Sequence, residues 1–258
     1  MKKGRFAGLV YRELYLCRKD LITSLVMFAG FAFLGFMLLL SFYYGNVGKI
    51  LASILADGRG DALPDAQEVY ERMRSGLFFA MKLSPELMIM GIAFSATNIT
   101  AKDTKVSWLR YEHCTPVTPL RYSAVRTTVN VILTAASAAI GILYMFLIGL
   151  ISGEGLVYRE LSLLMLMVVM FTALGTISQI FILLIGDQDK GMLASMGVIM
   201  LTAWGLAYSL RDADPDLDGF ETFMNAAETL LPYSPFILAG LFALLFAALY
   251  FIYKRREK

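Results

Sequence analysis

Among the residues whose types could support chemistry, one charged and aromatic segment is prominent, residues 101–122, which lies between two long apolar runs. The segment carries Trp108, Arg110 and Tyr111, and these residue types are enriched in protein interfaces. Ordering such a polar loop costs free energy unless something binds it. The sequence therefore predicts a docking surface for a soluble partner, which moves the membrane helices on either side.

The adjacent His113 and Cys114 do not indicate a metal centre or a nucleophile. The chain contains a single histidine, whereas a zinc site needs three or four ligands and a cysteine nucleophile needs a histidine placed across the fold. The only other cysteine is Cys17, and both fall on the predicted cytoplasmic side, which fits a reducing compartment. We expect no catalytic, metal-binding or cofactor-binding residue in this chain, and therefore no enzyme activity of its own.

The nearest approach to a phosphate-binding loop is residues 186–192. Its two glycines have the Walker spacing, but Met192 stands where a lysine must reach the phosphates. Asp187 and Asp189 would also repel them. Any ATP hydrolysis must therefore come from another chain.

A second acidic motif, residues 214–219, resembles the first half of a calcium-binding EF-hand loop. Oxygen-bearing side chains alternate and a glycine stands sixth, but the twelfth position is Asn225 instead of glutamate. Pro215 is also unusual there. Calcium binding and a solvated acidic loop both remain open, and the solvated loop is favoured.

Two further groups are candidates within apolar stretches. Lys82 and Glu86 are spaced i,i+4 and form the one clear ionisable pair, for which we favour a place in the outer membrane interface over a functional role. Asn98, Met165 and Met196 could line an adaptable cavity, although methionines at helical spacing more often simply pack.

The elements that must position these residues are membrane-length helices. The chain has 258 residues, of which 58% are hydrophobic and 17% charged, with a mean hydropathy of +0.64. Soluble domains carry about 25% charge, and about 20 apolar residues cross a bilayer as a helix. We predict an all-α polytopic membrane protein with a single transmembrane domain, 1–258, in which span two is broken or begins near Ser84. The six spans expected are 21–44, 76–101, 125–152, 161–186, 192–210 and 236–253.

The first 20 residues alternate charge with apolar residues and predict an amphipathic helix in the membrane interface. An ordinary basic juxtamembrane segment is the alternative. The expected apolar face consists of Phe6, Leu9, Val10, Leu14 and Cys17. The expected basic face consists of Arg5, Arg12 and Lys19.

The first span carries a row of small residues, which permits close helix packing in a membrane. We predict that this row lies at or near the contact with a second copy of the chain. Its members are Ala29, Gly30, Ala32 and Gly35.

Orientation follows from the lysines and arginines, which favour the cytoplasmic side. With both termini inside, 16 of the 23 lie in cytoplasmic segments. Residues 45–75 and the acidic loop 211–235 then lie outside. The remaining seven basic residues are Lys49, Arg59, Arg72, Arg74, Lys82, Arg159 and Arg211.

Two segments resemble those of ABC-2 type transporter permeases. Residues 1–20 are similar to the basic interfacial helix with which that family begins. Residues 102–119, with Trp108, Tyr111 and the run Thr-Pro-Val-Thr-Pro at 115–119, resemble the loop between its second and third spans. Here Cys114 and Thr115 replace the usual leucine or serine before Pro116.

This resemblance implies a bacterial plasma-membrane exporter of hydrophobic or amphipathic compounds, with ATP and Mg²⁺ bound by a separate ATPase present in two copies. It implies a second permease copy, with a homodimer expected, surrounding membrane lipids, and no nucleic acid. The subtype resembled most is that exporting amphipathic peptides such as phenol-soluble modulins; drug and bacteriocin exporters come next. The coupling residues expected in the ATPase groove are Val106, Trp108, Leu109, Arg110, Tyr111, Glu112 and His113.

Two other classes compete with this prediction. A secondary transporter would need broken helices at repeated positions and a midplane charge, and only span two is broken. A non-transporting scaffold or sensor subunit would lack an ATPase partner. A membrane enzyme is disfavoured by the absence of a catalytic cluster.

Overall fold

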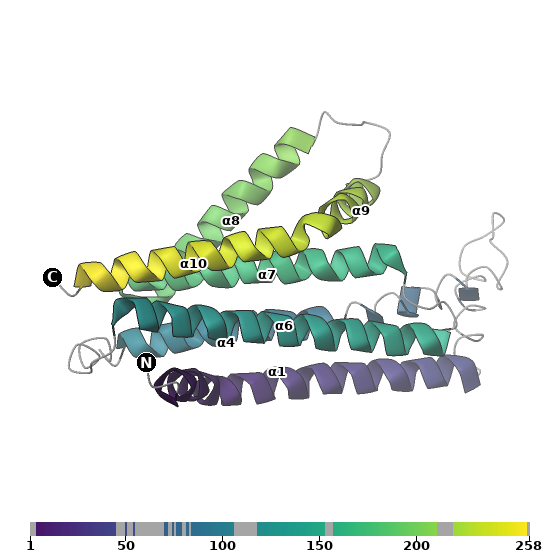
Figure 1. Cartoon of the computed structure of the whole chain (residues 1–258). Coiled ribbons are helices and arrows are strands. Elements are labelled where there is room, and N and C mark those ends of the chain that lie inside the picture. Colours follow the sequence, from purple (N-terminus) through teal and green to yellow (C-terminus); the bar gives the residue numbers. More distant parts are fainter. Residues whose placement is uncertain are drawn as a thin grey trace.

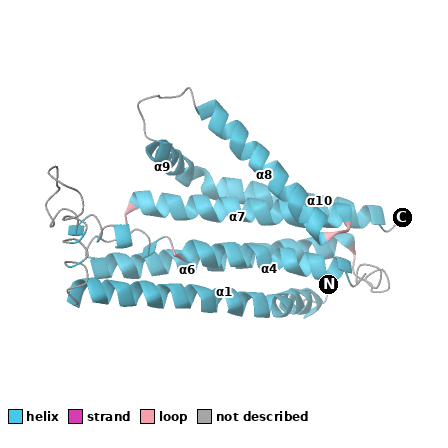
Figure 2. Cartoon of the chain, turned by 180° about the vertical axis from the view of Figure 1, so that it is seen from behind, coloured by secondary structure: helices cyan, strands magenta, loops and turns pink. Residues whose placement is uncertain are grey.

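The computed structural model describes residues 4–44, 84–105, 118–152, 157–210 and 219–256, together with scattered positions between 50 and 82. Within these ranges the chain is helical apart from short turns, and it contains no strand (Figures 1 and 2). The all-α prediction is therefore confirmed. The helices are α1 (Gly4–Tyr44), α4 (Pro85–Lys105), α6 (Pro119–Ser152), α7 (Tyr158–Ile185), α8 (Gln188–Leu210), α9 (Gly219–Leu230) and α10 (Ser234–Arg256), with a short 3₁₀ turn at Leu231–Tyr233.

Five helices, α1, α4, α6, α7 and α10, lie side by side and form a bundle (Figure 1). Helix α8 leaves this bundle at an angle, and α9 crosses it at the far end. Successive long helices run in opposite directions. The first and last described residues therefore lie at the same end of the bundle, which we call the terminal end.

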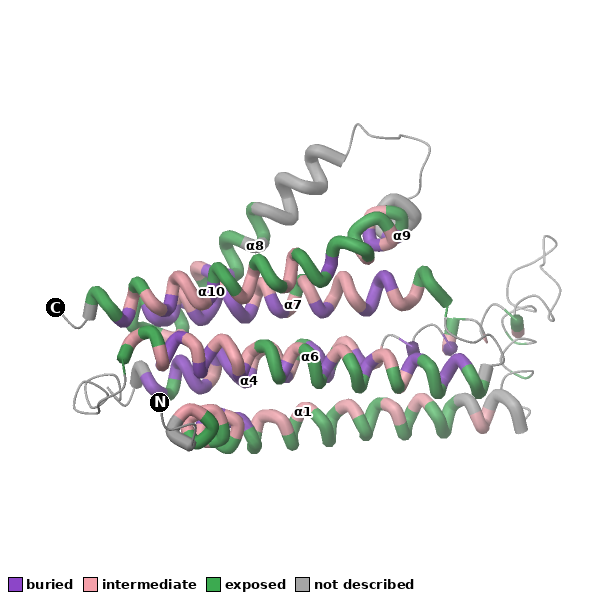
Figure 3. The backbone as a smooth tube through the Cα atoms, viewed as in Figure 1, coloured by how far each residue is buried: buried purple, intermediate pink, exposed green. Residues whose placement is uncertain are grey.

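Four helical segments are long and apolar enough to cross a membrane. Large apolar side chains of these segments are exposed, among them Phe31, Leu143 and Phe251. Exposed positions recur along each of these helices in Figure 3. Exposing so much apolar surface to water costs free energy, whereas exposing it to lipid does not. We conclude that this is a membrane-embedded helical protein. The four segments are Phe6–Leu38, Pro119–Ile151, Tyr158–Ile185 and Met224–Arg255.

Helix α4 is more polar than these four and packs against α1, α6 and α7. Its residue Glu86 stands in the first turn and Asp103 in the last. The preceding Ser84 is a turn, and its N–H donates to the carbonyl of Met81 at 3.1 Å. The predicted interruption near Ser84 is thus present, and Pro85 takes the first helical position, where proline is well tolerated.

Helix α1 is continuous over 41 residues, where the sequence suggested an interfacial helix ending at Asp20 and a separate span. At 1.5 Å per residue it is about 60 Å long, twice the thickness of the bilayer core. Its first turns are seen end-on in both Figures 1 and 2, so they run across the direction of the bundle.

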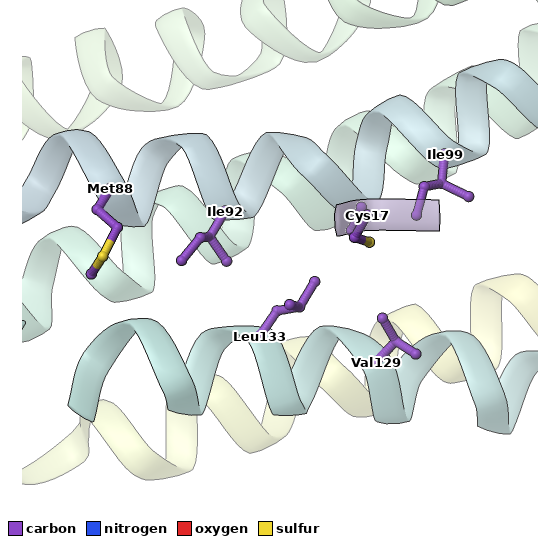
Figure 4. Packing of buried hydrophobic residues seen from close by; sticks show 7 residues of the cluster. Cys17, Met88, Ile92, Ile99, Val129 and Leu133 are labelled. Atoms are coloured by element: carbon purple, nitrogen blue, oxygen red, sulfur yellow. The ribbon is translucent and has the colours of Figure 1, made fainter. Parts of the chain in front are cut away.

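The apolar face expected to insert into lipid instead covers the bundle. Val10 and Leu14 pack against a buried cluster that includes Cys17. Figure 4 shows Cys17 of α1 between side chains of α4 and α6. A different face of α1 is therefore exposed. The other buried members of this cluster are Met88, Ile92, Ala96, Ile99, Val129 and Leu133.

The short gap predicted between the spans 161–186 and 192–210 is a tight turn between α7 and α8. Gly186 takes a left-handed φ of 77° and donates its N–H to the carbonyl of Ile182 at 2.8 Å. The Asp187 carboxylate accepts the backbone N–H groups of Asp189 and Lys190 at 2.9 and 3.1 Å. This capping starts α8 at Gln188, four residues before the predicted span.

The expected acidic loop 211–235 contains a helix, which corrects the prediction. Helix α9 buries Met224 and Ala227, and it packs against α7. Glu228 lies 3.8 Å from Arg159 at the start of α7. Asn225 is part of α9, while positions 214–218 of the calcium-like motif lie outside the described residues.

Candidate functional site

The most concentrated polar chemistry among the described residues is a buried ionic cluster around Arg126 on α6, whose side chain is only 3% exposed. Its guanidinium donates to the Asp103 carboxylate and to the Thr100 hydroxyl, the second at 2.6 Å. Its Nε donates to the Tyr122 hydroxyl at 3.1 Å, and that hydroxyl donates to Asp103 at 3.3 Å. We call Glu13, Thr100, Asp103, Tyr122 and Arg126 the Arg126 cluster.

Two more helices reach the Arg126 cluster. The Glu13 carboxylate of α1 is buried and lies 4.0 Å from Nε of Arg126. The ring of Tyr253 on α10 meets the ring of Tyr122 edge-to-face, with centroids 4.6 Å apart. Helices α1, α4, α6 and α10 are therefore held together at one level of the bundle.

A pair of amides, the buried Gln179 and the half-buried Asn130, extends this polar layer to α7. Gln179 donates to Asn130 at 3.0 Å, and Asn130 donates back at 3.4 Å. A small cavity is lined by both amides together with Glu13 and Arg126. The layer thus connects five helices near the terminal end.

Placing charges inside a helical bundle is expensive unless they are paired. In the Arg126 cluster two carboxylates face one guanidinium, and hydroxyls take up further hydrogen bonds. Among the described residues no group of three or more His, Cys, Asp or Glu could hold a metal. The cluster is therefore suited to joining helices, because Arg126 of α6 contacts Thr100 and Asp103 of α4 and Glu13 of α1.

The sequence reasoning missed this site. It counted Arg126 only as a charge for orientation, and it named Lys82 and Glu86 as the one clear ionisable pair within an apolar stretch. One signal was present: Tyr122, Arg126 and Asn130 recur every four residues and so share one face of an otherwise apolar helix. Their partners on α1, α4 and α7 could not be read from that spacing.

The charged segment predicted as the loop 102–122 is shorter in the structure. Helix α4 continues to Lys105 and α6 begins at Pro119, so Asp103 and Tyr122 are helical. The predicted coupling residues lie outside the described residues; they are Val106, Trp108, Leu109, Arg110, Tyr111, Glu112 and His113. The two helix ends that bound them lie at the terminal end of the bundle (Figure 1).

The predicted row of small residues on α1 is divided between two surroundings. Ala29 and Gly30 are exposed, and a Cβ added at Gly30 would meet nothing within 4 Å. Ala32 and Gly35 are half-buried, and a Cβ on Gly35 would lie 3.0 Å from Cγ of Met81. Gly35 thus serves packing within the chain, whereas Gly30 faces outward.

The three proposed cavity residues do not converge. Asn98 and Met165 are half-buried on α4 and α7, and Met196 is exposed on α8. None of them lines the cavity beside Arg126 or the apolar cavity between α7, α9 and α10.

The predicted pairing of Lys82 with Glu86 is wrong. Lys82 is 1% exposed, and its Nζ lies 2.8 Å from the carboxylate of Glu160 in the first turn of α7. The turn at Ser84 interrupts the helix between Lys82 and Glu86, so the i,i+4 geometry is lost. One carboxylate oxygen of Glu86 is buried without a hydrogen-bond partner.

Comparisons with protein-family models, with curated proteins and with solved structures found no match for this chain. The fold and the Arg126 cluster together define a helical membrane protein whose helices are joined by a buried ionic layer.

Proposed function

We propose that this chain is the membrane-spanning permease subunit of an ATP-driven exporter of the ABC-2 type. The resemblance of residues 1–20 and 102–119 to that family motivates the proposal. The observation that carries it is the Arg126–Asp103 pair, which ties the last turn of α4 to the first turns of α6. These are the two helices that bound the segment proposed to bind the ATPase.

In this proposal, each of two copies of a separate ATPase binds residues 106–113 of one permease chain. A force on that segment acts on α4 and α6 together, because separating a buried ion pair costs several kcal/mol. Glu13 and Tyr253 then pass the displacement to α1 and α10. The permease itself holds no nucleotide; ATP and Mg²⁺ belong to the partner.

The proposal includes six spans, with α4 and α8 added to the four clearly apolar ones. Both termini lie on the cytoplasmic side of a bacterial plasma membrane. Support comes from the alternating helix directions and from exposed basic residues at the terminal end, among them Lys102, Lys190 and Lys254.

The proposed cargo is a hydrophobic or amphipathic peptide, and the proposed assembly is a homodimer. The outward face of α1 around Gly30 is apolar and open. Surfaces of this kind suit both lipid and a second helix that packs by van der Waals contact.

The decisive experiment replaces Trp108 with alanine in the chain co-expressed with its proposed ATPase partner. Truncating an interface anchor typically costs about 2 kcal/mol or more. Trp108→Ala should abolish peptide export and ATPase stimulation while leaving membrane insertion intact. Tyr233→Ala, an exposed aromatic at the other end of the bundle, serves as the control and should keep both activities. If Trp108→Ala still binds and stimulates the ATPase at the wild-type rate, the coupling proposal fails.

A secondary transporter remains the second candidate because two buried carboxylates, Glu13 and Asp103, face the bundle interior. Proteoliposomes distinguish the two functions. Export that requires ATP and ATPase supports the permease, whereas uptake or export driven by an imposed proton gradient without ATP supports the rival.

A further inference from the structure

One face of α1 near the terminal end is exposed and combines aromatic rings with positive charge. Tyr11, Tyr15, Arg18 and Ile22 are spaced i, i+4, i+7 and i+11, so they form one stripe along the helix. Tyr11 is 70% exposed, Tyr15 48% and Ile22 61%. This is not the face that packs against α4 and α6.

The positive charge of the stripe is held in place by a ring. The guanidinium carbon of Arg18 lies 3.8 Å from the centroid of the Tyr15 ring, and that ring stacks on Tyr11 at 6.3 Å. No carboxylate among the described residues lies within ion-pair distance of Arg18, whereas the nearby Asp20 is already paired with Lys102 at 3.6 Å. Stacking on a ring leaves the edge N–H groups of a guanidinium free to bind an oxyanion.

The depth of the stripe in a bilayer follows from the helix itself. From Ile22 to the end of α1 at Tyr44 the sequence carries no charge, and at 1.5 Å per residue this length is about 33 Å. The hydrocarbon core of a bilayer is about 30 Å thick. Arg18 and Tyr15, one to two turns before Ile22, therefore fall at the level of the lipid phosphates.

We propose that the Tyr11–Tyr15–Arg18 face binds the headgroup of an anionic phospholipid on the membrane side that carries both termini. The Arg18 guanidinium holds the phosphate, and the exposed neighbour Lys19 adds charge complementarity. The two tyrosines lie in the interfacial layer, as amphipathic rings do. The stripe continues without a break into the exposed apolar surface at Ile22, which favours a lipid over a soluble protein as occupant. This inference does not depend on the transport role.

The test measures lipid binding to the purified full-length chain in mild detergent. Phosphatidylglycerol and phosphatidylcholine are titrated separately, and native mass spectrometry counts the bound lipids. The wild-type chain should retain phosphatidylglycerol in preference to phosphatidylcholine. Arg18→Gln should weaken phosphatidylglycerol binding about fivefold, the effect of one basic residue near an anionic surface. Tyr15→Leu should weaken it as well, because the guanidinium loses its support.

Arg255→Gln is the matched control, since it removes one exposed positive charge at the same end of the bundle. It should leave phosphatidylglycerol binding close to wild type. Circular dichroism and gel filtration verify that each variant is folded. We expect all of them to fold, because the replaced side chains are exposed. Equal losses in Arg18→Gln and Arg255→Gln, or no preference for phosphatidylglycerol in the wild type, would overturn the proposal. So would an Arg18→Gln chain that loses a protein partner but binds phosphatidylglycerol normally.

Discussion

Removing the charge of Arg126 is the sharpest test of the buried ionic layer. In the wild type the Arg126 guanidinium contacts Asp103, Thr100 and Tyr122. In Arg126→Met a flexible apolar side chain replaces it. The buried Asp103 carboxylate then loses its guanidinium partner, while Glu13 keeps the half-buried Arg12 at 3.5 Å. The variant loses the attraction between the guanidinium and the carboxylates, and it also leaves a buried carboxylate charge unpaired. The second effect is the larger.

The expected magnitude follows from burial. Breaking a buried ion pair by removing one partner lowers the free energy of unfolding by about 3–5 kcal/mol. The matched control is Lys102→Gln, in which an ion pair to Asp20 at 3.6 Å is lost from a lysine that is 63% exposed. Water screens such a pair, so the control should change the free energy by less than about 1 kcal/mol.

The measurement is reversible unfolding in detergent micelles, followed by the helical circular dichroism signal. Arg126→Lys keeps the charge but loses part of the hydrogen bonding, so its stability should lie between wild type and Arg126→Met. Adding Asp103→Asn to Arg126→Met should restore part of the stability, because one unpaired carboxylate becomes neutral. If Arg126→Met is no more destabilising than Lys102→Gln, the cluster is hydrated and the reasoning is refuted.

Three further predictions follow from single contacts. Gly191→Ala should destabilise the chain by about 1–3 kcal/mol in a thermal denaturation assay, because the added Cβ would meet backbone atoms of α7 at 2.7–2.8 Å. In the same assay Gly197→Ala should be neutral or stabilising, because the space around Gly197 is open. Lys82→Met should lower stability by about 3 kcal/mol or more, since it leaves the mostly buried Glu160 carboxylate unpaired. Arg159→Gln breaks the exposed pair with Glu228 and should change stability by less than about 1 kcal/mol. Equal effects of the two variants would contradict the burial argument. In intact cells a cysteine replacing Arg159 should react with an impermeant thiol reagent and one replacing Lys190 should not, and the reverse result would invert the proposed orientation.

Local features of the fold were predictable from the sequence because each is determined by neighbouring residues. Apolar runs of membrane length predicted α6, α7 and α10 to within six residues at each end. A proline after Ser84 predicted the start of α4, since proline is accepted in the first turn of a helix. The short polar run 187–190 predicted a tight turn before α8. The structure shows why it forms, because Gly186 takes the left-handed conformation and Asp187 caps the next helix.

The extent of α1 and the presence of α9 were less predictable. Charges up to Asp20 suggested that a helix ends there, but charged side chains at the membrane surface are compatible with one continuous helix. The acidic composition of residues 211–235 suggested a loop, yet Met224 and Ala227 recur at helical spacing and find α7 to pack against. Composition alone does not reveal such a partner.

The amino-acid sequence by itself determined that this chain is a helical membrane protein, because length and hydrophobicity decide which segments can cross a bilayer. It also placed the basic residues that mark the terminal end. Only the tertiary structure decided that Lys82 pairs with Glu160 instead of Glu86, and that Arg126 meets Asp103 and Glu13. The physical reason is that a buried charge is stabilised by partners brought from other helices, and the identity of those partners depends on how the helices pack.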